Sequence, residues 1–99
     1  MKTKLQQIDE WVSEAFPENS FMIPDGFEDA FMGVAIQFNK PIAIIDYDKC
    51  LNILLKDGMS LHEAEEYIEF NVTGAYVGED TPAFLFKYKN YETSRNTKD

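Results

Sequence analysis

The residues best suited to chemistry lie close together, where one histidine stands among four glutamates. His62 and Glu66 are four residues apart, a spacing that places both side chains on the same side of a helix. Such a pair can bind a metal ion, and carboxylates from elsewhere in the chain would make the ligand set suitable for Mg²⁺ or Mn²⁺. The competing interpretation is an ordinary solvated helix face, because runs of charge on a helix usually face water.

Asp46 and Asp48 are the second candidate pair. They follow an apolar run that predicts a strand, and functional residues concentrate where strands end. Two residues apart in a strand, they would point to the same face. Aspartate is equally a preferred cap for the helix that begins here. The sole cysteine, Cys50, falls on the apolar stripe of that helix, which indicates a core residue rather than a nucleophile.

The chain is strongly acidic, with 18 Asp and Glu against 9 Lys and Arg and a net charge of -9. This balance opposes direct binding of nucleic acid, because Lys and Arg supply most of that affinity. No Lys or Arg stands between Lys4 and Lys40, or between Lys56 and Lys87, and each block holds seven acids. We therefore expect a negatively charged face that engages a protein partner with a basic surface. The candidate binding residues are Glu63, Glu66, Glu69, Tyr76, Glu79 and Asp80.

No apolar run approaches the roughly 20 residues needed to span a bilayer, and the first residues are polar where a signal peptide needs an apolar core. A single cysteine cannot form an internal disulfide, which agrees with a reducing compartment. These features predict a cytoplasmic protein that makes no membrane contact.

The apolar periodicity and the turn residues predict the elements that position these candidates. Helices are expected at 3–16, 47–57 and from 61 onward, and strands at 20–23, 31–38, 41–46 and 81–89. The order helix, strand, strand, strand, helix, helix, strand is an α+β plan. We expect a small, mostly antiparallel sheet of about four strands with three helices packed on it. Residues 1–89 would form a single compact domain, and residues 90–99 a flexible polar tail.

Two local signals sharpen this plan. Ser60 and Glu63 have the spacing of a capping box, which predicts a helix that starts at Leu61, and Gly58 suits the end of the helix before it. The segment 71–82 has two open interpretations, a binding loop or a structural connection to the last strand.

Several short motifs carry a resemblance to a known family. They are Tyr47-Asp48-Lys49-Cys50, Asp57-Gly58-Met59-Ser60, Glu63-Ala64, Glu66-Tyr67, Phe70-Asn71-Val72, Gly74-Ala75-Tyr76-Val77-Gly78 and Thr81-Pro82. Over about Gly26 to Phe84 the chain resembles a small uncharacterised family of proteins encoded by phages and prophages. The resemblance transfers no catalytic residue. It implies a host-cell cytoplasmic setting, and a role as an inhibitor or modifier of a host protein, such as a nucleic-acid-binding or defence protein.

The leading expectation is thus a non-enzymatic protein–protein interaction module without a cofactor. One alternative is a metal-dependent hydrolase or nuclease that uses Asp46 and Asp48 with His62 and Glu66, and Mg²⁺ or Mn²⁺ as its metal. Another is a structural homodimer that pairs the strand at 83–89.

Overall fold

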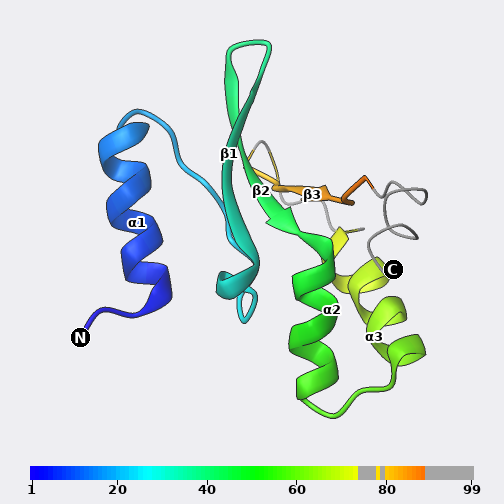
Figure 1. Cartoon of the computed structure of the whole chain (residues 1–99). Helices are drawn as coiled ribbons and strands as arrows, with labels where there is room; N and C mark the ends of the chain where they lie inside the picture. Colours follow the sequence, from blue (N-terminus) through cyan, green and yellow to red (C-terminus); the bar gives the residue numbers. More distant parts are fainter. Residues whose placement is uncertain (74–77, 79, 89–99) are drawn as a thin grey trace, which may run out of the picture.

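Three α-helices and one three-stranded sheet form the described part of the chain (Figure 1). The computed structural model describes residues 1–73, 78 and 80–88. The elements in order are α1 (Lys4–Ala15), the 3₁₀ turn η1 (Glu28–Ala30), β1 (Phe31–Gln37), β2 (Lys40–Asp46), α2 (Tyr47–Lys56), α3 (Leu61–Ile68), the π-helical turn η2 (Glu69–Thr73) and β3 (Ala83–Leu85). The α+β class is as expected, with three strands in place of about four.

β1 and β2 form the expected antiparallel hairpin, with Gln37 opposite Lys40. The turn between them consists of Phe38 and Asn39, whose φ angles are 51° and 64°. Two consecutive positive φ values define the turn that best matches the twist of paired strands. Phe38 therefore lies in the turn, one residue beyond the end of β1, and its side chain is 94% exposed.

β3 pairs with β2 in parallel, with Ile44 opposite Ala83 and Asp46 opposite Leu85. The sheet is therefore mixed, with the order β1-β2-β3. The direction follows from the connection, because a chain that leaves β2 through helices returns to run alongside it in parallel. β3 is also shorter than the strand expected at 81–89, of which Lys89 lies outside the described residues.

The strand expected at 20–23 is absent, since this segment has no regular structure. A strand needs a neighbouring strand for its backbone groups, whereas this segment is held by contacts of its side chains. Ser20 donates its hydroxyl to the Asp80 carboxylate at 2.7 Å, and Ile23 packs against the core. The tail expected at 90–99 lies outside the described residues.

Local capping fixes the two helices that follow the hairpin. Asp46 caps α2, accepting the backbone N–H of Lys49 at 3.3 Å. Gly58, with φ 102°, follows the end of α2 and permits the reversal there. Ser60 and Glu63 form the expected capping box at the start of α3.

The core lies between the sheet and these two helices. α2 packs on β2, and α3 packs on α2. The buried cluster consists of Phe27, Ala30, Ile45, Cys50, Leu54, Ala64 and Ile68. Cys50 is fully buried there, as its position on the apolar stripe indicates. None of the helices in the described residues has the length and apolar character that crossing a membrane requires.

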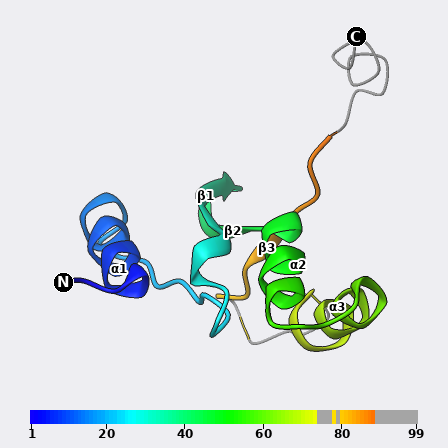
Figure 2. The same cartoon turned by 60° about the horizontal axis from the view of Figure 1, so that its bottom comes forward.

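α1 stands apart from this core. Figures 1 and 2 both show it on one side of the hairpin, with α2 and α3 on the other. Its one buried residue is Ile8. Trp11 makes edge-to-face contacts with Phe16 and Phe31, at ring-centroid distances of 6.0 and 6.2 Å. Instead of covering a sheet face, α1 is thus held at the start of β1 by aromatic contacts.

Candidate functional site

The outer face of α3 carries carboxylates next to exposed aromatic rings. Ala64 and Ile68 are the buried residues of the helix, so its opposite side faces water. Glu63 and Glu66 lie on that outer side. Phe70 follows Glu66 by four residues, which brings it to the same side one turn later. Phe70 is 76% exposed, so its large apolar ring is presented to the solvent.

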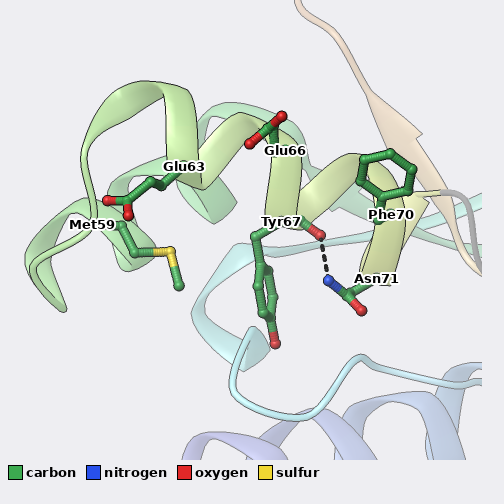
Figure 3. A pocket seen from close by; sticks show the side chains of 6 residues that line it. All are labelled: Met59, Glu63, Glu66, Tyr67, Phe70 and Asn71. Atoms are coloured by element: carbon green, nitrogen blue, oxygen red, sulfur yellow. Dashed lines mark hydrogen bonds between the residues drawn. The ribbon is translucent and has the colours of Figure 1, made fainter.

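A shallow cavity of about 330 Å³ opens beside these residues (Figure 3). It is lined by Met59, Glu63, Glu66, Tyr67, Phe70 and Asn71. Figure 3 shows Met59 and Tyr67 pointing to the same side, away from Glu66 and Phe70. Asn71 donates its amide N–H to the backbone carbonyl of Tyr67 at 3.2 Å, which ties η2 to the last turn of α3. The result is an apolar hollow with carboxylates at its rim.

Hydrogen bonds keep Glu63 charged and oriented. Its carboxylate Oε1 accepts the backbone N–H of Ser60 at 2.9 Å, and the Ser60 hydroxyl accepts the backbone N–H of Glu63 at 3.2 Å. The Ser60 backbone N–H and then its hydroxyl hold the pKa of Glu63 below its usual value. A carboxylate fixed in this way needs little reordering when a cation approaches.

Glu66 lies next to His62, as the sequence spacing predicts. Its Oε2 lies 3.6 Å from His62 Nε2, but the two side chains are 59% and 81% exposed. A contact between side chains this exposed contributes about 0–1 kcal/mol to stability, so a cation of a partner can readily replace it. Glu66 is therefore available to a partner.

Two of the remaining predicted binding residues, Glu69 and Asp80, do not line this cavity. Glu69 is the first residue of η2 and is exposed. Asp80 lies elsewhere and accepts the Ser20 hydroxyl. Tyr76 and Glu79 lie outside the described residues, which at 71–82 leave out 74–77 and 79.

The predicted metal ligands are separated by the fold. Both oxygens of Asp46 are engaged, since Oδ1 accepts the Lys49 N–H and Oδ2 lies 3.1 Å from Lys87 Nζ. Asp48 falls in the first turn of α2 instead of the strand, so the shared face expected for the pair does not form. His62 and Glu66 are adjacent, as described above. Across residues 1–73, 78 and 80–88, no three His, Cys, Asp or Glu side chains group in a way that could hold a metal ion.

The aromatic part of the site was missed by periodicity. In the helical pattern from Leu61 onward, Tyr67 and Phe70 widen the apolar side, which predicts that they are at least partly covered, whereas both are exposed. A signal for the correct placement is present in the spacing, since Tyr67 follows Glu63 by four residues and Phe70 follows Glu66 by four. Comparison with protein-family models, with curated proteins and with solved structures finds no match to this chain.

Proposed function

We propose that this chain is a non-enzymatic interaction module that binds a basic surface of a partner protein through the outer face of α3. The observation that carries this proposal is the exposed Phe70 ring one helical turn from Glu66, on a hollow that Glu63 also lines. An arginine side chain matches this combination, because its guanidinium stacks on aromatic rings and pairs with carboxylates.

The negative charge and the aromatic ring have different roles in this binding. The net charge of -9 attracts a basic partner and speeds the encounter. Affinity then depends on the aromatic anchor, since buried aromatic residues dominate the energy of most interfaces. Extending the family resemblance, the partner we propose is a host nucleic-acid-binding or defence protein whose basic surface is blocked by this face.

The site can be tested without knowing the partner. We would titrate the ¹⁵N-labelled chain with an arginine-rich peptide and follow backbone amide shifts. Shifts should concentrate in residues 59–71 and weaken as salt is raised, because exposed charges are screened. Phe70→Ala should weaken binding about ten-fold, corresponding to ~1.4 kcal/mol.

A matched pair of variants separates the site from general charge. Glu63→Gln with Glu66→Gln removes two charges yet keeps a capping box, because glutamine also serves at that position. Glu14→Gln with Glu18→Gln removes the same charge near the end of α1. The first pair should weaken peptide binding and the second should not. If both pairs weaken peptide binding equally, the affinity depends on net charge alone, and the proposed site is wrong.

Once a partner is captured from host extract, competition decides the mode of action. If the α3 face blocks a nucleic-acid-binding surface, DNA or RNA should displace the chain from that partner. Simultaneous binding of nucleic acid and chain would contradict this part of the proposal.

A further inference from the structure

β1 forms an open edge of the sheet in the described part of the chain. The strand order β1-β2-β3 gives β1 one neighbour, β2, and no described strand lies on its other side. Proteins usually protect such an edge with lysine, proline or a short strand. β1 has seven residues, Phe31–Gln37, with no charged residue and no proline. A bulge between Phe31 and Gly33 is the one irregularity in its pairing.

The hairpin register identifies which backbone groups face outward. A two-residue turn closes on a pair that exchanges hydrogen bonds, here Gln37 with Lys40, and such pairs alternate along antiparallel strands. Gln37, Ala35 and Gly33 therefore direct their backbone N–H and C=O groups toward β2. Val34 and Ile36 direct theirs to the open edge. The Ile36 side chain is 57% exposed, so this edge is also apolar.

The charge distribution favours this edge for contact between two copies. Ala30 to Ile45 is an uninterrupted stretch in which Lys40 is the single charged residue. The chain as a whole carries -9, so two copies repel each other through most faces. If two copies meet through their hairpins, residues 30–45 of each copy contribute no Asp or Glu to the contact, so this face avoids the repulsion. α1 meets β1 at its first residue, through Trp11 and Phe31, which leaves the part toward the turn open.

We propose that β1 pairs antiparallel with β1 of a second copy, which joins two three-stranded sheets into one across a two-fold axis. In such a pairing, the outward N–H and C=O groups of β1 must hydrogen-bond to the outward groups of β1 in the other copy. Registers whose axis passes through a residue satisfy this, and the two that best centre the contact on the exposed part of β1 have the axis at Val34 or at Ala35. Either register sets the Lys40 end of one hairpin toward the end of the other copy's β1 that follows Asp29, so opposite charges approach.

A second copy suits this edge better than an unrelated strand. The same surface serves both partners in a two-fold contact, so apolar residues are matched with apolar residues automatically. With the axis at Val34, Met32 and Ile36 lie opposite each other at both ends of the contact. This contact uses a different part of the molecule from the α3 face and does not depend on the proposed function.

The oligomeric mass tests the pairing. Sedimentation equilibrium over a range of concentrations should show twice the chain mass at high concentration. Ile36→Pro should abolish the dimer without unfolding the chain, because this residue's N–H faces the open edge and not β2. Ile36→Lys should also abolish it, and keeps the backbone intact if the proline variant fails to fold. Leu61→Lys, at a 53% exposed position on α3, is the matched control and should remain dimeric.

Cross-linking then fixes the register. In an antiparallel two-fold contact the residue on the axis meets itself at about 4.5–5.5 Å between Cα atoms, within disulfide range. Oxidation should cross-link either Val34→Cys or Ala35→Cys, whereas the parent chain, whose Cys50 is buried, should not cross-link. A chain that is monomeric at every concentration would overturn the proposal. So would a dimer that survives both Ile36 variants, or one that cross-links at neither position.

Discussion

A buried carboxylate links the last strand to the start of the helical hairpin. The Asp46 side chain is 1% exposed and lies 3.1 Å from the Lys87 ammonium, which is 48% exposed. Asp46 also caps α2. One side chain thus holds the end of β2, the first turn of α2 and the residues that follow β3. Removing its charge tests whether this junction supports the fold.

The two partners should respond unequally to substitution. Asp46→Asn keeps a good N-cap but loses the ion pair, and the freed lysine can turn to water. We expect a loss of about 2 kcal/mol, between the ~0–1 of exposed pairs and the ~3–5 of broken buried pairs. Lys87→Met should cost at least as much, because it leaves a buried carboxylate without its cation.

The loss of stability caused by Asp46→Asn should depend on pH. Burial acts to raise the pKa of Asp46, but the hydrogen bond from Lys87, the N–H of Lys49 and the charge of Lys87 together hold it below its usual value. A carboxyl with a lowered pKa stabilises the fold above its unfolded pKa, about 3.9, and this contribution is lost as the pH falls through the folded pKa. The difference in unfolding free energy between the parent and Asp46→Asn should therefore be full at neutral pH and shrink below about pH 4.

A double-mutant cycle measures the interaction itself. Urea unfolding of the parent, both single variants and the double variant, followed by circular dichroism, gives the coupling free energy. We expect about 1–2 kcal/mol. A coupling below ~0.3 kcal/mol at neutral pH would refute the inference that Lys87 stabilises the Asp46 charge, since this is the scatter between independent sites.

Two further changes probe single positions. Phe38→Asn should add about 1 kcal/mol to the free energy of unfolding and so raise the melting temperature. Asparagine tolerates the positive φ of this position, and the exposed Phe38 ring contributes little to packing. A lower melting temperature would show that the ring supports the hairpin. Burial raises the pKa of Cys50 to about 11, with the Asp46 charge adding to the effect, so the native thiol should resist a disulfide reagent at about pH 8 and react once urea unfolds the chain. Rapid native reaction would contradict the burial of Cys50.

Local signals predicted local structure well. The capping box of Ser60 and Glu63 and the glycine after α2 depend on neighbouring residues, and both form where expected. The hairpin also forms, but its turn lies at Phe38 and Asn39, one residue earlier than the expected strands at 31–38 and 41–46 imply. Relations between distant segments were harder. Alternation of side chains identifies a strand but not its partner, so the direction and length of β3 were missed. The helices between β2 and β3 did contain the information, because such a connection favours parallel pairing.

The candidate site was predicted only in part, because local spacing does not show what packs against α3. Helical spacing placed Glu63 and Glu66 on the water-facing side. It could not show that the core ends before Leu61, which begins α3 and is 53% exposed despite its apolar side chain. Nor could it show that Phe70 stands beyond Ile68, the last buried residue of α3. How far a core extends along a helix depends on what packs against it, and one helix alone does not define this.

The junction at Asp46 also bears on how the chain is completed during synthesis. Asp46 emerges 41 residues before Lys87, the difference between their two positions. In that interval the carboxylate has no lysine partner at position 87, and Phe84, which packs against the core, is also missing. The hairpin and the helical hairpin can form early because their contacts are close in sequence. Closure of the core must wait until nearly the whole described chain has been made, so the nascent protein should become protease-resistant late and in one step.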